Sequence, residues 1–424
     1  MKNRNRIAVV ALFTLLISGC SFAQGVFNVI KVTGASPDSL IAVNDNGVVL
    51  VNSGNQVSTW SRSGETQNLV LSGTNSSGAA INNSGDVAGI ADPAHASSVE
   101  AYIWHASGDL QWLGSLGGSL SVAAGINDAG AVVGHSYTSA YKQHAFLWTA
   151  AGGMQDLTPT ITNVGGATAM GVNSTTQVVG YYFPNGSLNT VGFLWTQSGG
   201  LQNLGSAGTL AFAINDAGTV VGQLTSAKGF RHAFSWTQSA GFTDLGTLGG
   251  GESSALSVNR LGWIVGTSQT TSKTGYQHGY LWTATAGMKD LNTLAPPIAS
   301  LNKQTYSLQV NNAGVIAMST NKGGYLLSPK MTVTIKSPVN PSVVGQAVTF
   351  TAKMTSLAGA APDGETVQFV TNGTVLGTGT LHAGTAQFTT SSIGLGRHAV
   401  VATYVGDANY LTATSASVVQ VVNQ

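Results

Sequence analysis

The sequence has little cysteine, little charge and no long apolar run, and each shortage narrows what the protein can be. Cys20 is the single cysteine, so the chain beyond it has neither a disulfide nor a thiol nucleophile. Without the three basic residues of the first 23 positions, 14 basic residues stand against 16 acidic ones, a balance of −2 that excludes a nucleic-acid footprint. The longest apolar run, near the N-terminus, has about a dozen residues, whereas a membrane-spanning helix needs about 20.

Glycine and apolar residues are abundant by contrast. The chain has 424 residues, of which 55 are glycine and 43% are hydrophobic. This composition excludes a disordered chain and a collagen-like fibre, and it provides enough apolar material for two or more packed cores.

Residues 1–23 have the plan of a secretory signal peptide, with a basic start, an apolar stretch and small residues at the end. Two cleavage sites stay open. Residues 17–20 (Ile-Ser-Gly-Cys) resemble a bacterial lipobox, which would make Cys20 the acylated first residue of an outer-membrane lipoprotein. Residues 21–23 (Ser-Phe-Ala) instead suit ordinary signal peptidase, which would release the protein. Either way we expect an exported protein, extracellular or at the cell surface, whose only membrane contact is that lipid anchor.

One short phrase recurs seven times after the leader: a small or apolar residue, Asn, usually a polar pair, Gly and a β-branched doublet. Its asparagines lie 38 to 52 positions apart, the length of a four-stranded propeller blade. The turn predicts a hairpin, because Asn and Asp side chains bond their own backbone and Gly accepts positive φ. The anchoring residues are Asn44, Asn82, Asn127, Asn173, Asn215, Asn259 and Asn311.

Each unit predicts four short strands, A to D, and no helix. In the third unit we place them at residues 122–127, 131–136, 144–149 and 154–157. Strand C carries a tryptophan in six of the seven units, which we interpret as packing between blades rather than as a platform for sugars. These residues are Trp60, Trp104, Trp148, Trp195, Trp236 and Trp282.

The seventh unit runs into Pro329 without a D strand, whereas residues 26–32 form an extra strand ahead of the first unit. Pairing that strand with the seventh sheet would close a ring and remove two exposed edges. We therefore predict an all-β chain with a seven-bladed β-propeller at residues 25–329. An open solenoid of stacked units is the alternative.

The phrase at residues 144–148 (His-Ala-Phe-Leu-Trp), with its echoes at 232–236 and 278–282, resembles the HAF-repeat family of probable extracellular bacterial proteins. The resemblance covers residues 40–328 and implies an exported repeat protein with no catalytic residues to transfer. The second and fourth units lack the His, so a site that needed one imidazole per blade would be incomplete.

A different plan begins after Pro329. Residues 330–424 have no Trp or Cys and predict six or seven strands of an antiparallel sandwich, with Val348, Phe350, Ala352 and Met354 on one inward face. Residues 345–352, 375–381 and 404–410 resemble the group 3 bacterial immunoglobulin-like domains, which implies a spacer or adhesive module. Tyr404 or Tyr410 is expected to cap the sandwich by bonding a backbone carbonyl.

No catalytic or phosphate-binding motif is present, and the acidic residues recur at repeated positions, as in Asp128 and Asp216 after the turn asparagine. Such residues hold turns and strand ends more often than they catalyse. The turns offer too few carboxylates for calcium. We expect no enzyme activity, no metal and no cofactor, with His144, His232 and His278 hydrogen-bonded at strand starts.

The connections from B to C and from D to A vary most between units, and in an up-and-down blade both emerge on the same face. Aromatic rings, cations and amides gather in the B to C connections, a mixture suited to a polysaccharide or a protein hot spot. The candidate ligand-binding residues are Tyr137, Tyr141, Lys142, Tyr181, Tyr182, Phe183, Lys228, Phe230, Arg231 and Tyr276.

The resulting hypothesis is a non-enzymatic envelope or extracellular protein that binds a surface glycan or protein through this face. Ordinary solvated loops are the plain alternative for the same residues. A glycan hydrolase or lyase on a propeller scaffold and a purely structural surface protein are the rival functions.

Overall fold

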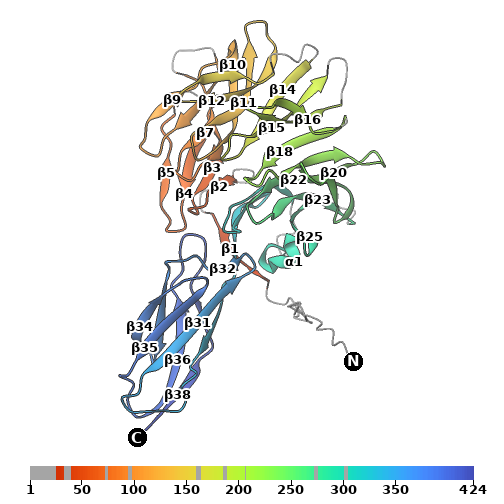
Figure 1. Ribbon diagram of the computed structural model, residues 1–424. Coiled ribbons are helices and arrows are strands. Elements are labelled where there is room, and N and C mark those ends of the chain that lie inside the picture. The colour runs from red at the N-terminus through yellow and green to blue at the C-terminus, as the bar shows by residue number, and fades with distance from the viewer. Residues whose placement is uncertain are drawn as a thin grey trace, which may run out of the picture.

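The computed structural model describes residues 25–32, 40–71, 75–93, 98–158, 164–184, 189–205, 207–271, 276–299 and 304–424. Seven four-stranded sheets form the N-terminal domain and two further sheets form the C-terminal one (Figure 1). Two short helices, α1 (Leu291–Leu294) and α2 (Pro296–Ala299), link the sixth sheet to the seventh. Within these ranges no helix is long and apolar enough to cross a membrane. The predicted leader, with Cys20 and both predicted cleavage sites, lies outside the described residues.

The seven sheets follow one another along the chain as blades 1 to 7, and strand A of each blade comes first. Blades 1 to 3 consist of β2 (Leu40–Val43), β3 (Val49–Ser53), β4 (Gln56–Trp60) and β5 (Thr66–Asn68); β6 (Ser77–Ile81), β7 (Val87–Ala91), β8 (Glu100–Trp104) and β9 (Leu110–Trp112); and β10 (Gly117–Ile126), β11 (Val132–Thr138), β12 (Gln143–Thr149) and β13 (Gly153–Asp156).

Blades 4 to 7 repeat this plan. They consist of β14 (Val164–Val172), β15 (Val178–Pro184), β16 (Val191–Thr196) and β17 (Gly200–Asn203); β18 (Thr209–Ile214), β19 (Val220–Thr225), β20 (Arg231–Thr237) and β21 (Gly241–Gly246); β22 (Gly249–Val258), β23 (Ile264–Thr270), β24 (Gln277–Thr283) and β25 (Gly287–Asp290); and β26 (Thr305–Val310), β27 (Ile316–Thr320), β28 (Gly323–Pro329) and β1 (Phe27–Lys31).

The strands of blade 3 lie close to their predicted places. β11, β12 and β13 agree within two residues at each end with the predicted strands B, C and D. The A strand differs, because β10 begins at Gly117, five residues before the predicted start. The pairing of β10 with β11 shifts register between Gly117 and Ser121. Such an irregular segment does not require the regular alternation by which a strand is predicted, and the early start of β10 was therefore missed.

The ring is closed by the N-terminal strand. β1 pairs antiparallel with β28, from Phe27 opposite Pro329 to Lys31 opposite Tyr325, and so becomes the missing D strand of blade 7. The A strands contact one another all the way round, β26 of blade 7 against β2 of blade 1 included. Both the predicted strand exchange and the seven-bladed ring are confirmed, and the open solenoid is excluded.

Apolar side chains from neighbouring blades pack together at each junction. Trp148 of β12, for example, lies in a buried cluster with Ile103 of blade 2 and Phe146 of its own blade. The other strand C tryptophans pack into equivalent clusters, which confirms their structural role. Gly134 lies opposite Phe146, and a Cβ there would meet the Val122 carbonyl oxygen at 1.9 Å, so a larger residue could not fit. Burial of this kind stabilises the fold by about 25 cal/mol per Å² of apolar surface.

A second set of contacts joins the blades at the inner edge of the ring. The seven anchoring asparagines are buried, and each side-chain Nδ2 donates to the backbone carbonyl of the next asparagine. The last bond runs from Asn311 to the Asn44 carbonyl at 2.9 Å and completes the circle. Each Oδ1 accepts one or two backbone N–H groups of its own turn, for example those of Ala129 and Ala131 on Asn127. Aspartate could make the turn bonds but not the bond to the neighbour.

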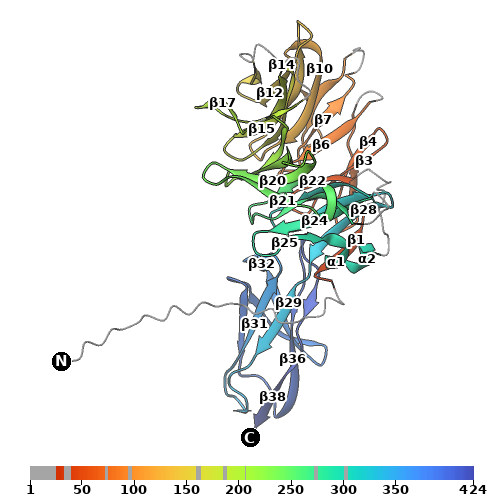
Figure 2. The same ribbon diagram turned by 90° about the vertical axis from the view of Figure 1, so that its right-hand side faces the viewer.

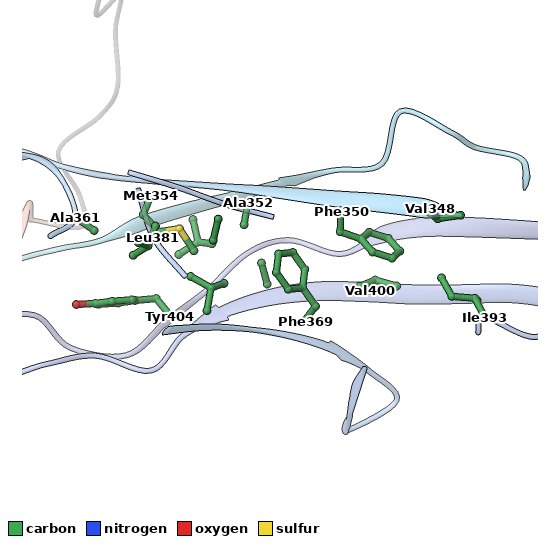
Figure 3. Close-up of a cluster of buried hydrophobic side chains, with 14 of the residues drawn as sticks. Val348, Phe350, Ala352, Met354, Ala361, Phe369, Leu381, Ile393, Val400 and Tyr404 are labelled. Atoms are coloured by element: carbon green, nitrogen blue, oxygen red, sulfur yellow. The ribbon is translucent and has the colours of Figure 1, made fainter. Parts of the chain in front are cut away.

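The C-terminal domain is a sandwich of two sheets. One holds β29 (Thr332–Lys336), β31 (Val348–Ser356), β32 (Gly359–Ala360) and β35 (Thr385–Thr390); the other holds β30 (Ser342–Val343), β33 (Thr366–Thr371), β34 (Thr374–Thr380), β36 (Gly396–Tyr404), β37 (Ala413–Thr414) and β38 (Val418–Asn423). The inward face predicted for residues 348–354 is confirmed, since its four apolar side chains are buried. Figure 3 shows them interleaved with Phe369, Val400 and Tyr404 of the opposite sheet.

The two tyrosines of this domain have different partners from those expected. The Tyr404 hydroxyl donates to the Asp407 carboxylate at 2.8 Å rather than to a carbonyl, and burial raises its pKa. The Tyr410 hydroxyl does bond a carbonyl at 2.8 Å, but the carbonyl belongs to Ala313 of the propeller. Tyr410 is buried in the sandwich core, and through this bond it also links the two domains.

Candidate functional site

The antiparallel order of each blade separates its connections into two faces. The A to B and C to D turns lie on one face, which we call the turn face. The B to C and D to A connections lie on the other, which we call the loop face. Only the loop face carries the variable connections, so the candidate ligand-binding residues are considered there.

Exposed aromatic side chains occur on the loop face in four consecutive blades. Blades 3 to 6 each present one at or beside the B to C connection, and their exposed fractions are 82% for Tyr141, 38% for Phe183, 49% for Phe230 and 43% for Tyr276. In blades 1 and 7 this connection is a turn of only two residues, 54–55 and 321–322. Two further exposed aromatic side chains, Phe242 and Tyr306, lie in strands β21 and β26 rather than in B to C connections.

The structure corrects the placement of five of the ten candidates. Tyr137 lies in β11, Tyr181, Tyr182 and Phe183 lie in β15, and Arg231 begins β20, whereas the sequence placed them in loops. Strand B continues beyond its predicted end because aromatic residues favour extended backbone and pair across to strand A. The remaining five, Tyr141, Lys142, Lys228, Phe230 and Tyr276, lie in the connections as predicted.

The neighbouring rings of β15 are partly occupied by the fold. The Tyr182 hydroxyl donates to Asn203 Oδ1 at 3.2 Å, and its ring packs against the cluster between blades 3 and 4. Tyr181 meets Phe183 edge to face at 5.9 Å between ring centres, and burial raises the Tyr181 pKa. Of these three residues, Phe183 offers the most exposed aromatic surface.

Tyr141 combines the largest exposure with an unfavourable backbone conformation. Its φ is +56°, in the left-handed region that favours glycine, and it is held there by a turn in which its N–H donates to the Thr138 carbonyl at 3.0 Å. A side chain in this region costs about 1 to 2 kcal/mol. Strain at an exposed residue that contributes little packing is a common property of functional positions.

The acidic and histidine side chains repeated around the ring have structural partners. His144, His232 and His278 bond the strand D carboxylates of Asp156, Asp244 and Asp290 through Nδ1 at 2.7 to 2.8 Å, as expected for histidines at strand starts. These pairs tie strand C to strand D at the outer edge of blades 3, 5 and 6. Among the described residues, no three His, Cys, Asp or Glu side chains are grouped to hold a metal ion.

A central cavity of 510 Å³ is enclosed by the seven A strands. Its wall includes the apolar residue before each ring asparagine, and Met170, Phe212 and Leu256 widen the apolar surface in blades 4 to 6. Its rim, on the turn face, consists of the residues after the asparagines. The rim carboxylates of Asp128 and Asp216 accept the backbone N–H groups of Asn83 and Ser174 at 2.8 Å, so they join neighbouring turns.

Comparison with known proteins identifies the C-terminal domain. Residues 333–423 match the model of the bacterial Ig-like domain (group 3). That match confirms the resemblance stated for this segment, whereas the HAF-repeat resemblance of residues 40–328 stays a prediction. No curated protein matches the chain.

Several solved structures match the chain at low sequence identity. A catalytically inactive virginiamycin B lyase from Staphylococcus aureus with quinupristin is 12% identical, with 71% of this chain and 98% of that chain covered and a TM-score of 0.44. The extracellular domain of a hybrid two-component system from B. thetaiotaomicron is 9% identical, with 94% and 59% covered and a TM-score of 0.45. A gluconolactonase from Xanthomonas campestris is 10% identical, with 71% and 89% covered and a TM-score of 0.39. The fold assignment rests on the chain's own sheets.

Proposed function

We propose that this is an exported, non-enzymatic recognition protein that binds a surface or extracellular glycan through its loop face. The row of exposed aromatic side chains in blades 3 to 6 carries the proposal. Aromatic faces stack on sugar rings, and an exposed tyrosine held in a strained backbone indicates selection for something other than stability. The predicted secretory leader and the bacterial immunoglobulin-like domain support export.

The charges beside these rings favour an acidic glycan. Lys142 follows Tyr141, and Lys228 and Arg231 flank Phe230; all three cations are exposed. A uronic acid or sulfated sugar would bring a carboxylate or sulfate to these cations while its ring stacks on an aromatic face. In this proposal the immunoglobulin-like domain spaces or supports the propeller, and Cys20 provides a lipid anchor if the lipobox is used.

The test is a thermal melt of residues 25–424 with neutral polysaccharides, acidic polysaccharides and envelope protein fractions. Ligand at 100 times its dissociation constant adds about 2.7 kcal/mol of stability. We expect acidic polysaccharides to raise the melting temperature of the unaltered chain, and Tyr141→Ala and Phe230→Ala to abolish that shift. The matched control is Leu261→Ala, which removes an apolar side chain of 43% exposure from the turn face and should keep the shift.

Each other outcome assigns a different function. A shift with envelope proteins alone would identify a protein partner, and turnover of a polysaccharide would indicate a hydrolase or lyase. The absence of any saturable shift would reject recognition in favour of a structural surface protein.

A further inference from the structure

The immunoglobulin-like domain is docked on the propeller by two of its loops. Figures 1 and 2 show the sandwich meeting the propeller at one end only. Ala358, in the turn between β31 and β32, packs against the cluster that contains Trp263 of blade 6. Residues 408–410, between β36 and β37, contact the A to B turns of blades 1 and 7. The contact surface therefore lies on the turn face, opposite the exposed aromatic residues.

Asn409 bonds both blades at the point where the ring closes. Its Nδ2 donates to the Asp45 carbonyl of blade 1 at 2.8 Å, and its Oδ1 accepts from Asn311 Nδ2 of blade 7 at 2.8 Å. Asn311 Nδ2 also donates to the Asn44 carbonyl, the bond that completes the asparagine circle. We call this junction of blades 7 and 1 the seam. Asn311 is thus shared between the seam and the docked domain.

Steric fit reinforces these hydrogen bonds. A Cβ built on Gly47 of blade 1 would lie 2.7 Å from the Ala408 carbonyl oxygen, and one on Gly314 of blade 7 would lie 3.0 Å from Ala358 Cβ. The same turn position in blade 3, Gly130, has nothing within 4 Å. The turn of blade 1 therefore approaches the backbone of the second domain too closely for a side chain, and the turn of blade 7 lies against both Ala358 and Trp263 of blade 6.

The connection between the domains leaves little freedom. β28 ends at Pro329 and β29 begins at Thr332, so only two residues intervene. The first of them, Lys330, donates its N–H to the Val26 carbonyl at 2.9 Å, beside the strand that closes the ring. Ser328, in that same blade, donates its hydroxyl to the Asn409 carbonyl.

From this arrangement we propose that the immunoglobulin-like domain is a clasp: it docks across the seam and holds the ring shut where the two ends of the propeller meet. Between other neighbouring blades, strand D is covalently continuous with the rest of its own sheet. At the seam, the strand D that leads into blade 1 is β1, which is held to β28 only by hydrogen bonds, so the ring is closed here without a covalent link. The second domain is bonded to both sides of this closure, through Asp45 on one side and through Asn311 and Ser328 on the other. Undocking should loosen the seam before any other junction.

The test is hydrogen exchange in residues 25–424 with Asn409→Ala. This change removes the bonds to Asn311 and Asp45. Loss of one to two net hydrogen bonds predicts exchange at β1, β2 and β26 that is faster by about tenfold. Blade 4 is the internal reference and should exchange as in the unaltered chain, while unchanged protection of β31 and β36 would show that the sandwich itself remains folded. Equal acceleration in all blades, or no change at the seam, would overturn the proposal.

Two glycine variants separate docking from turn strain. Gly47 and Gly130 have φ of +71° and +75°, so alanine strains both turns alike, but only Gly47→Ala also clashes with Ala408. We expect Gly47→Ala to accelerate hydrogen exchange at the seam more than Gly130→Ala accelerates it at the junction of blades 3 and 4. Asn409→Ala added to Gly47→Ala should produce little further change, because both act by undocking. Equal effects of the two glycine variants, or full additivity, would refute the clasp.

Discussion

Asn127→Asp tests whether the asparagine circle holds the blades together. Asn127 is buried, its Nδ2 donates to the Asn173 carbonyl at 2.9 Å, and its Oδ1 accepts from Ala129 and Ala131. Aspartate keeps the shape and both accepted bonds but places an ionised oxygen where the donor was. The Asn173 carbonyl then keeps only the bond from the Thr176 N–H, and an ionised carboxylate is buried beside it. We expect a loss of about 3 kcal/mol at neutral pH.

The pH dependence of this variant has a definite sign. Burial favours the protonated form of the new carboxyl group, and that form can donate to the Asn173 carbonyl. Its folded-state pKa therefore rises above the unfolded value of about 3.9. The folded state then binds the extra proton, and stability relative to the unaltered chain is best below that unfolded value. Stability falls as the pH rises through the unfolded pKa to the raised folded one. A loss of about 3 kcal/mol corresponds to a rise of about two units in the folded-state pKa of the new carboxyl group.

Thermal unfolding of residues 25–424 between pH 3 and pH 8, with Asn46→Asp as control, measures both effects. Asn46 Nδ2 also donates to the carbonyl of a neighbouring blade, that of Asn83, at 2.7 Å, but this bond is exposed and water can replace it. The control should lose less than about 1 kcal/mol and show little dependence on pH. Equal losses in the two variants, or an Asn127→Asp deficit that does not shrink in acid, would refute the reasoning.

Three further changes give directional predictions. Thr176→Gly should raise stability by about 0.5 to 1 kcal/mol in denaturant titration, because Thr176 has a φ of +61° where the other A to B turns have glycine. His135 is half-buried, and burial lowers its pKa from 6.5. The contribution of its neutral side chain to stability is therefore fully present above pH 6.5 and is lost as the pH falls through the lowered pKa. His135→Gln should flatten this decline in melts between about pH 7 and pH 5. Tyr141→Gly should relieve backbone strain and leave the melting temperature no lower, while polysaccharide titration shows binding lost.

The ring could be predicted from the sequence because its signals are local. The Asn-x-x-Gly turn indicates a hairpin in six of the seven blades, and a seventh unit without its D strand requires the strand at residues 26–32. Turn chemistry and the exposed edge of a sheet both act over a few residues. The limits of strand B in blade 4 were less accessible, although the run Tyr181 to Phe183 is itself typical of a strand.

The contacts between blades and between domains were beyond the sequence. Asn127 meets the Asn173 carbonyl 46 positions later, a distance that no local rule reaches. A signal existed, since the anchoring position is asparagine in all seven units while the next position varies among Asp, Asn, Ser and Arg. A turn alone would accept aspartate, so the absence of aspartate indicates a need for a donor. Asn409 carried no such signal, because its partners are 98 and 364 positions away.

The strand that closes the ring also sets the order in which the ring can be completed. β1 is the first strand of the propeller to be synthesised, yet its partner β28 lies near the end of the propeller. At 5 to 20 residues per second, the intervening stretch of about 300 residues takes roughly 15 to 60 s to make. For that time β1 has no sheet to join and blade 7 does not exist. The growing chain therefore carries an unpaired strand until translation has passed the last blade, and a truncated product would retain two open edges prone to pairing with other chains.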